Sequence, residues 1–502
     1  MTAADSFDLW RKRLGMVLFV PVFVMLWLAP LPVAPQAHRL AAVLGAVVVL
    51  WVSEAIPMAM TAFLGVAVAT VLQVASPNEA FAPFADPLIF LFIGTFLLAQ
   101  AIFVHGLDRR FALAILSLPG VGRSPARILA AFAGATCLIS MWISNTATTA
   151  MMYPIGLSLL RFLEQQQPQR DSRSDHLAGF GALLLLSAAF ASSIGGLATP
   201  VGTPPNLIGI GFIRRELAIS FPFFSWMAVG LPIAVAMFAW LVFDFTRGDR
   251  FGGSFASGAQ SLAAVIAAER RRLGSWSRGQ INTVVAFGMT VVLWLVPGVA
   301  ALIFGQDDPL YRQLITWFPE AIVALLGAGL LFFLPVDLSR HQFTLSWSDA
   351  IKIDWWIVFL YGGGIALGTL AFKTGLARDL GEGLTSLLGI RSGFALLVLS
   401  TVIATVLSET TSNTAAANMV VPVVIAFARS SGIDPLIPAL GATMGASLGF
   451  VLPVSTPTNA IVYGSGRIPL TVMIRYGLVL DVAGVVLIVT MLSLLGLWIA
   501  PL

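Results

Sequence analysis

The tripeptide Ser-Asn-Thr occurs twice in this chain, at 144–146 and at 412–414. Each copy interrupts an apolar run and is followed by a proline, Pro154 in the first half and Pro422 in the second. Each half also carries a later polar segment, Thr-Pro-Pro-Asn at 203–206 and Thr-Pro-Thr-Asn at 456–459. Paired interruptions at corresponding places in two apolar halves are typical of transporter binding sites. The duplication therefore indicates a transport protein with two related halves.

The surroundings of these motifs are those of a membrane protein. The chain is 58% hydrophobic and 10% charged, whereas a soluble domain carries about 25% charged residues. A helix crosses a bilayer with about 20 mostly apolar residues. Whole spans or their cores recur at 16–30, 40–52, 87–104, 281–302, 355–371 and 482–500. We predict an all-α polytopic membrane protein, without a cleavable signal because the polar start leads directly into the first span.

The basic residues predict the topology. With the N-terminus in the cytoplasm and alternating spans, about 20 of the 28 Lys and Arg fall on one side, the asymmetry of a cytoplasmic face. This count requires that two segments, roughly 124–160 and 392–429, enter and leave on the same side. Each contains one Ser-Asn-Thr. We predict about 11 transmembrane helices plus two re-entrant hairpins in two inverted repeats, with the C-terminus outside.

Several other functions find little support in the sequence. The single Cys137 excludes an internal disulfide and a cysteine metal cluster. The net charge of +4 is spread over many loops, so we expect no nucleic-acid partner. An intramembrane enzyme would need paired acids or a Ser/His pair within the spans, and the scattered residues supply neither, so no enzyme is expected. A channel stays open as an alternative, because channels can also use inverted repeats.

The interrupted segments have the chemistry of an ion site. Asn, Ser and Thr offer both donors and acceptors, and free N–H groups at a helix start favour an anion. Oxygen ligands favour a hard cation such as Na⁺. Proline breaks a helix, and Gly195, Gly196 and Gly202 permit close backbone approach. Since no Lys or Arg falls at these centres, an anion would be held by neutral donors, helix ends and co-bound cations.

Four acidic residues deserve separate interpretation, because charges inside a membrane are costly and often functional. Glu54 and Asp354 lie near predicted span ends and are interpreted as interfacial. Glu409 precedes the second tip, where we expect it to stabilise the tip or tune a cation site without binding the ion itself. Asp481 falls within a span and has no assigned role.

The chain resembles the divalent-anion/sodium symporter family, the sodium–dicarboxylate, citrate and sulfate carriers, from about residue 15 to its end. The matching motifs are 446–462, which fits the C-terminal signature, 51–57 (Trp-Val-Ser-Glu-Ala-Ile-Pro) and the Gly-rich 361–364. The resemblance implies a scaffold domain that dimerises and a transport domain that moves as an elevator. The expected divisions are scaffold spans 1–120, first hairpin and unwound helix 121–215, mainly scaffold spans 216–390 with a cytoplasmic linker 246–280, second hairpin and unwound helix 391–468, and a C-terminal span 469–502.

The resemblance also implies site residues. One sodium site maps to Ser140, Ser144, Asn145 and the backbone near Gly202, and the other to Ser408, Thr411, Asn413 and the backbone near Ser455. The substrate-binding positions are Asn145, Thr146, Thr203, Pro204, Asn413, Thr414, Thr456 and Pro457. Two segments depart from the family: 455–459 reads Ser-Thr-Pro-Thr-Asn instead of Ala-Thr-Pro-Pro-Asn, and 415–417 reads Ala-Ala-Ala instead of Ala-Thr-Ala.

We therefore expect a secondary transporter that imports a C4-dicarboxylate such as succinate, malate or fumarate together with Na⁺. It would be a homodimer in the lipid bilayer of a bacterial inner membrane. Asn145 and Asn413 would bridge cation and substrate. The alternatives are a sodium-independent dicarboxylate exchanger and a citrate or sulfate carrier of the same fold.

Overall fold

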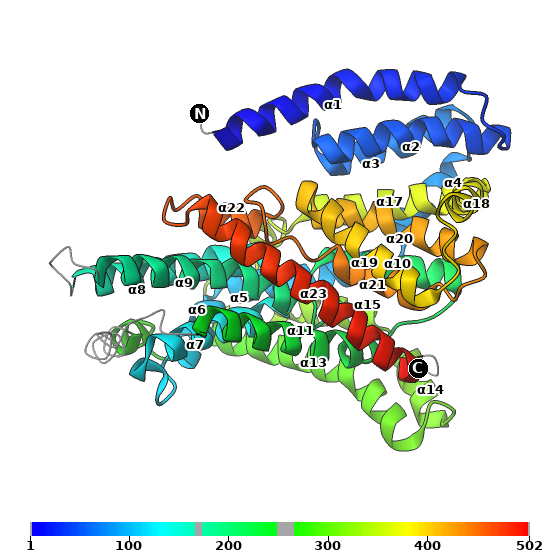
Figure 1. The fold of residues 1–502 in the computed structure, drawn as a ribbon. Helices are drawn as coiled ribbons and strands as arrows, with labels where there is room; N and C mark the ends of the chain where they lie inside the picture. The colour runs from blue at the N-terminus through cyan, green and yellow to red at the C-terminus, as the bar shows by residue number, and fades with distance from the viewer. Residues whose placement is uncertain (1–2, 166–172, 248–265, 500–502) are drawn as a thin grey trace.

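The described part of the chain is mainly helical, as predicted (Figure 1). A computed structural model describes residues 3–165, 173–247 and 266–499. Its α-helices are α1 (Ala3–Leu28), α2 (Pro35–Ser53), α3 (Met58–Val71), α4 (Pro77–Phe81), α5 (Pro87–Val104), α6 (Leu107–Leu116), α7 (Pro125–Ser140), α8 (Asn145–Gln165), α9 (Arg173–Gly196), α10 (Pro204–Leu217), α11 (Phe223–Thr246), α13 (Arg278–Phe304), α14 (Pro309–Trp317), α15 (Glu320–Phe333), α16 (Trp347–Ala350), α17 (Trp355–Lys373), α18 (Leu376–Leu388), α19 (Gly393–Thr410), α20 (Asn413–Ser430), α21 (Leu436–Gly445), α22 (Pro457–Tyr463) and α23 (Leu470–Ile499). Short 3₁₀ turns cover Ala82–Ala85 and Val121–Arg123, and an unpredicted ribbon pairs β1 (Pro335–Asp337) with β2 (Gln342–Phe343).

Membrane-spanning helices confirm the polytopic class. Among the described residues, eight helices are long and apolar enough to cross a bilayer, or nine if α14 and α15, bent by 50°, form one span. The first arm of the second hairpin, α19, is one of the eight, whereas α3 and α7 are shorter apolar helices. The count of about 11 spans, the inverted orientation and the sides of the termini therefore stay predictions. In Figure 1 the two termini lie at opposite sides of the molecule.

Both predicted hairpin segments consist of two helices joined by a short connection. The first consists of α7 and α8, and the second of α19 and α20, with the second helix of each beginning at the Asn of Ser-Asn-Thr. Ser144 and Ser412 accept hydrogen bonds from the backbone N–H groups of Ala147 (3.3 Å) and Ala415 (3.1 Å). Serine in this position satisfies a free N–H of the first helical turn. The repeated serine therefore starts each second helix and places the following Asn at the tip.

Each half also contains a helix interrupted by the second polar segment. In the first half the chain leaves α9 at Gly196 and enters α10 at Pro204; in the second it leaves α21 at Gly445 and enters α22 at Pro457. Proline is favoured at the first helical position, where its missing N–H is not needed. We call 197–203 the first break and 446–456 the second break.

The halves pack across one another in a reciprocal way. Helix α10, which follows the first break, packs on α20 and α21 of the second half. Helix α22, which follows the second break, packs on α8 and α9 of the first half. Corresponding elements thus exchange places between the two halves.

The Gly-rich motif at 361–364 explains how α17 fits between its neighbours. A Cβ on Gly362 would lie 2.5 Å from the Phe84 ring, one on Gly363 would lie 2.4 Å from Ala62 Cβ, and one on Gly364 would lie 1.9 Å from Asn418 Oδ1. Three consecutive glycines therefore let α17 touch three elements at once.

The predicted cytoplasmic linker 246–280 lies largely outside the described residues, which omit 248–265. Of its later part, 266–272 is helical, and α13 begins after Ser277. The helix is held to α6 by Arg109, whose guanidinium lies 2.8 Å from the Glu269 carboxylate.

Candidate functional site

The two tips have the same internal hydrogen bond. Ser140 Oγ donates to Asn145 Oδ1 at 2.8 Å, and Ser408 Oγ donates to Asn413 Oδ1 at 2.7 Å. Ser140 is the last residue of α7, Ser408 lies in the last turn of α19, which ends at Thr410, and in both cases the asparagine begins the second helix. The bond therefore fixes the asparagine side chain at the point where the chain reverses.

The two breaks are also closed in the same way. Asn206 Nδ2 donates to the carbonyls of Gly196 (2.9 Å) and Thr199 (2.8 Å). Asn459 Nδ2 donates to the carbonyls of Gly449 and Leu452, both at 3.0 Å. In each half the asparagine thus reaches back ten and seven residues. The last residue of each Thr-Pro-x-Asn motif is a clamp that holds its break in an irregular but defined shape.

Both clamp asparagines leave an oxygen unused. The Oδ1 atoms of Asn206 and Asn459 are buried and have no hydrogen-bond partner. A buried carbonyl oxygen without a donor is unfavourable, and such oxygens suit a hard cation. Each half therefore has a spare oxygen close to its break.

Each tip lies against the break of its own half. A Cβ on Gly196 would lie 2.5 Å from Asn145 Oδ1, and one on Gly449 would lie 3.3 Å from Asn413 Oδ1. Gly202 packs on Gly196 in turn, since a Cβ there would lie 2.6 Å from the Gly196 carbonyl. These glycines allow the backbone of the break to approach the tip closely.

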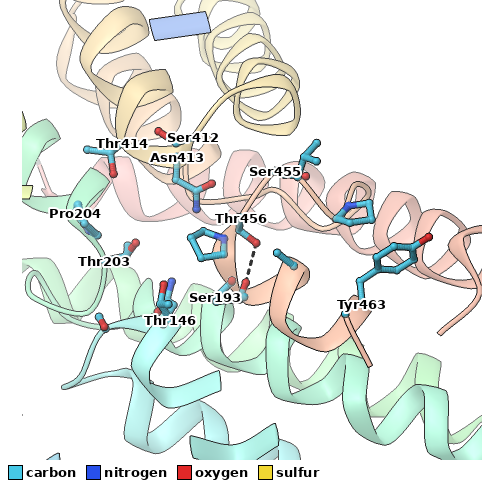
Figure 2. Close-up of a pocket in the computed structure, with 18 of the residues that line it drawn as sticks. Thr146, Ser193, Thr203, Pro204, Ser412, Asn413, Thr414, Ser455, Thr456 and Tyr463 are labelled. Atoms are coloured by element: carbon cyan, nitrogen blue, oxygen red, sulfur yellow. Dashed lines mark hydrogen bonds between the residues drawn. The ribbon is translucent and has the colours of Figure 1, made fainter. Parts of the chain in front are cut away.

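A cavity of about 970 Å³ opens where the tips and breaks meet. Figure 2 shows side chains from both halves around this space, among them Thr146, Thr203 and Pro204 from one half and Asn413, Thr414 and Thr456 from the other. All eight predicted substrate-binding residues line it: Asn145, Thr146, Thr203, Pro204, Asn413, Thr414, Thr456 and Pro457. The structure therefore gathers into one place residues that are up to 312 positions apart, from 145 to 457.

The predicted sodium-binding residues divide into two groups. Ser144, Asn145, Asn413 and Ser455 line the cavity, whereas Ser140, Gly202, Ser408 and Thr411 lie behind its wall. Ser408 Oγ also lies 2.8 Å from the Ala446 carbonyl oxygen, a second acceptor for its single hydrogen, and the hydroxyl of Thr411 donates to the Leu407 carbonyl at 2.7 Å. The oxygens of this set thus lie between tip and break, where a small cation could be held out of contact with the bulk of the cavity.

Several cavity residues are not among the predicted site residues. Ser193, Thr458 and Tyr463 line it beside the motifs, and the Thr458 hydroxyl lies 2.7 Å from that of Thr456, the contact drawn in Figure 2. Thr458 occupies the position of Pro205 in the first half, so the departure from the family pattern was a usable signal. Ser193 and Tyr463 carry no pattern that distinguishes them from ordinary helix residues.

The two acids interpreted as interfacial also reach this cavity. Glu54 and Asp354 both line its wall. Burial raises the pKa of Asp354 above its ordinary value. Glu54 follows α2 in a left-handed conformation (φ 49°), which is unusual for a residue with a side chain. Within the ranges that the structure describes, none of the lining residues is Lys or Arg.

The N-terminal helix reaches the second tip through Arg11. Its guanidinium donates to Glu54 Oε2 at 3.1 Å and to the Thr410 carbonyl at 3.2 Å. Close by, Ser412 Oγ lies 3.1 Å from Met58 Sδ at the start of α3. The second tip is therefore in direct contact with the predicted scaffold.

Glu409 stabilises the second break. Its carboxylate accepts hydrogen bonds from the backbone N–H groups of Val451 (2.9 Å) and Leu452 (3.1 Å), and it lies 2.7 Å from Ser455 Oγ. Hydrogen bonds to a charged group contribute about 1.5–3 kcal/mol each. A stabilising role for Glu409 agrees with its contacts, although these lie in the break and not in the tip itself.

Comparison with known proteins gives one consistent picture. The profile of the family described as "Sodium:sulfate symporter transmembrane region" matches residues 9–502. The chain is 31% identical over 443 residues to a protein of Staphylococcus saprophyticus named sodium-dependent dicarboxylate transporter SdcS, a match that covers 88% of this chain and 82% of the relative. The SdcS protein of Staphylococcus aureus strain USA300 is 30% identical over the same length.

Two solved transporter structures resemble the fold. The Alcanivorax borkumensis YdaH transporter aligns with a TM-score of 0.51 at 14% identity over 97% of both chains. MtrF of Neisseria gonorrhoeae aligns with a TM-score of 0.54 at 10% identity over 95% of this chain and 94% of the other. At these identities the likeness is one of fold alone.

Proposed function

Because the chain belongs to the sodium:sulfate symporter family, we propose that it is a secondary active transporter that imports a divalent anion together with Na⁺. Membership of the family confirms the resemblance found in the sequence. The most specific form of the proposal is a C4-dicarboxylate carrier for succinate, malate or fumarate. The curated relatives named as sodium-dependent dicarboxylate transporters support this choice.

The charge of the cavity is the observation that carries the proposal. Its described lining residues include two acids and no Lys or Arg, and the nearby Arg11 guanidinium is paired with one of these acids, Glu54 (3.1 Å), so a dianion entering alone would find no unpaired positive side chain in the wall to balance its charge. Cations bound at the tips would offset that charge. Sodium therefore binds first, at Ser140, Ser144, Asn145 and Gly202 in the first half and at Ser408, Thr411, Asn413 and Ser455 in the second. The carboxylates of the substrate then bind between the tips.

Helix starts supply the neutral donors for the substrate. Helices α8, α10, α20 and α22 begin at Asn145, Pro204, Asn413 and Pro457, and all four residues line the cavity. Free N–H groups and the helix dipole favour an anion at a helix start. The first two residues of α10 are prolines without an N–H, and the Asn206 N–H donates to the Thr203 carbonyl (3.2 Å). The free donors therefore come chiefly from α8 in the first half and α20 in the second, which can hold the two ends of a dicarboxylate.

The mechanism we propose is an elevator in which the hairpins and interrupted helices move past the scaffold. The wall of the cavity includes Asp354, Gly466 and Leu470, which the charge asymmetry assigns to the cytoplasmic side. On this assignment the structure is an inward-facing state. A homodimer formed by the scaffold domains completes the proposal.

Transport of labelled succinate into proteoliposomes tests the function. We expect uptake driven by an inward sodium gradient, inhibited by unlabelled malate and fumarate, and lost in Asn145→Ala. Asn282→Ala is the matched control, because Asn282 also makes two hydrogen bonds, to the Pro335 carbonyl (3.1 Å) and Thr344 Oγ1 (2.8 Å), but does not line the cavity. Succinate counterflow without sodium would identify an exchanger, and uptake of only citrate or sulfate would correct the substrate.

A cross-link tests the elevator. Met58 belongs to the predicted scaffold and Ser412 to the predicted transport domain, and their side chains are in contact (3.1 Å). In a Cys137→Ser background, a short thiol cross-link between Met58→Cys and Ser412→Cys should stop uptake, and reductive release should restore it. Full transport by the cross-linked protein would show that these two parts do not separate during the cycle.

A further inference from the structure

Asp481 in α23 is a buried acid without a partner. It is 5% exposed, lies within the candidate span Leu470–Leu494, and neither of its carboxylate oxygens has a hydrogen-bond partner. A charged group inside a membrane protein normally pairs with another group or an ion. This isolation needs an explanation that the tips and breaks do not supply.

The group that faces Asp481 is a second acid. The carboxylate of Glu409 and the backbone amide of Phe450 are the polar groups that act on it, although neither is placed for a hydrogen bond. One helical turn before Asp481, a Cβ on Gly477 would lie 2.2 Å from the Phe450 carbonyl. This close approach of α23 brings Asp481 against the second break.

Glu409 has the geometry of an anion with one acceptor position to spare. Oε1 accepts from the Val451 N–H, whereas Oε2 accepts from the Leu452 N–H and lies 2.7 Å from Ser455 Oγ. All three partners carry a hydrogen that can be donated to the carboxylate, which acts as the acceptor toward each of them. Since a carboxylate offers about four acceptor positions, one remains, on Oε1.

We propose that Asp481 and Glu409 bind a sodium ion behind the second break, at a site separate from the sodium positions at the two tips; this makes Glu409 a ligand, contrary to the expectation from the sequence. The inference rests on the proposed sodium coupling and adds a further cation to it. An all-oxygen set suits a hard ion.

The position of this ion gives it a role. Glu409 holds the amides of Val451 and Leu452 and contacts Ser455, and Ser455 lines the cavity. An ion that fixes Glu409 therefore orders the second break before the substrate arrives. By thermodynamic linkage, substrate binding at the break must tighten the ion to the same degree.

Sodium titration of the purified full-length protein, without substrate, tests the site. Thermal unfolding is followed while NaCl replaces choline chloride at constant ionic strength. In Asp481→Asn, which removes the charge at nearly constant volume, the sodium concentration for half-maximal stabilisation should rise at least about tenfold and the dependence should become less steep. The control is Asp244→Asn: Asp244 is also buried (3% exposed) but pairs with Arg247 at 2.8 Å, so its loss should lower the midpoint without changing the sodium dependence.

The outcomes separate this inference from the proposed function. If the wild type and Asn413→Ala differ in sodium response but Asp481→Asn matches the wild type, the additional site is refuted and the tip sites stand. If the wild type shows no sodium-specific stabilisation, sodium coupling itself fails. If Asp481→Asn alters only the pH dependence of unfolding, the group holds a proton and the sodium site is refuted. If Asp481→Asn does not fold, Asp481→Glu is used instead, because it keeps the charge but moves the carboxylate. The ratio of the stabilisation by NaCl to that by LiCl should then differ from that of the wild type, and an unchanged ratio would refute the site.

Discussion

Replacing Asn459 by alanine would open the second break in a way whose cost can be worked out. The amide donates to the carbonyls of Gly449 and Leu452, both at 3.0 Å. The Leu452 carbonyl keeps the Ser455 N–H (3.3 Å) as a donor and lies 2.7 Å from Ser455 Oγ, so its lost bond costs about 0.5–1.5 kcal/mol. The Gly449 carbonyl, left without the amide donor, costs about 1–3 kcal/mol, which gives about 1.5–4.5 kcal/mol in all. Water from the neighbouring cavity can reach Pro457 and Thr458 and would reduce this penalty. We expect a loss of about 2–4 kcal/mol.

In the variant, ligand binding must supply this free energy in order to restore the ordered shape of the break. Since about 1.4 kcal/mol corresponds to a tenfold change in affinity, the concentration of succinate that half-saturates uptake should rise about 30-fold or more. The assay is sodium-driven uptake into proteoliposomes over a range of succinate concentrations, with thermal unfolding measured on the same protein. Asn206→Ala should behave alike, because Asn206 makes the corresponding bonds at 2.9 and 2.8 Å.

Asn282→Ala again provides the comparison, because it also removes two hydrogen bonds, of 3.1 and 2.8 Å. It should lower stability while leaving the half-saturating concentration unchanged. The clamp hypothesis would be refuted by Asn459→Ala with wild-type half-saturation. It would fail equally if Asn282→Ala weakened uptake as much as Asn459→Ala.

Three further predictions concern single positions. Asn145→Ala and Asn413→Ala should abolish uptake while circular dichroism and thermal unfolding show a folded protein; normal uptake by either would remove that residue from the site. Thr458→Pro removes the hydroxyl that lies 2.7 Å from Thr456 Oγ1, a hydrogen bond of about 0.5–1.5 kcal/mol. The inhibition constants of succinate and citrate for transport should therefore change about 2- to 10-fold, and the order of the two should change. Inhibition constants identical to those of the wild type would contradict this prediction. Burial raises the pKa of Asp108 from 3.8 to about 6, so the stability that the protonated side chain contributes is present below pH 3.8 and is lost as the pH rises through about 6. The melting temperature of Asp108→Asn, measured relative to that of the wild type, should therefore rise between about pH 4 and about pH 7. A difference in melting temperature that does not change with pH would disprove the shift.

The cavity could be anticipated from the sequence because uncharged polar groups inside apolar runs are unfavourable in a membrane unless they bind partners or ligands. The repeated Ser-Asn-Thr and Thr-Pro-x-Asn motifs identify Asn145, Thr203, Asn413 and Thr456 without any structure. All four line the cavity. The same motifs also predicted where helices would end, since proline and glycine determine those ends by local geometry.

Other parts of the site depend on distant contacts that no local pattern records. Glu54 does lie at the end of α2, as expected, but it also lines the cavity, and Arg11 of α1 links it to Thr410 at the second tip. The donors to Glu409 are backbone amides 42 and 43 residues away. Span counting is uncertain for a similar reason: α3 has 14 residues and α7 has 16, shorter than the about 20 that a bilayer requires, so length alone cannot assign them.

The contact between Arg11 and the second tip has a practical consequence for anyone who produces this protein. An affinity tag fused at the N-terminus, or a shortened start chosen to improve expression, would alter the helix that carries this guanidinium. Its bonds to Glu54 Oε2 (3.1 Å) and the Thr410 carbonyl (3.2 Å) reach the cavity wall. Transport rates measured with N-terminal fusions should therefore be compared with C-terminal ones before they are taken as properties of the native carrier.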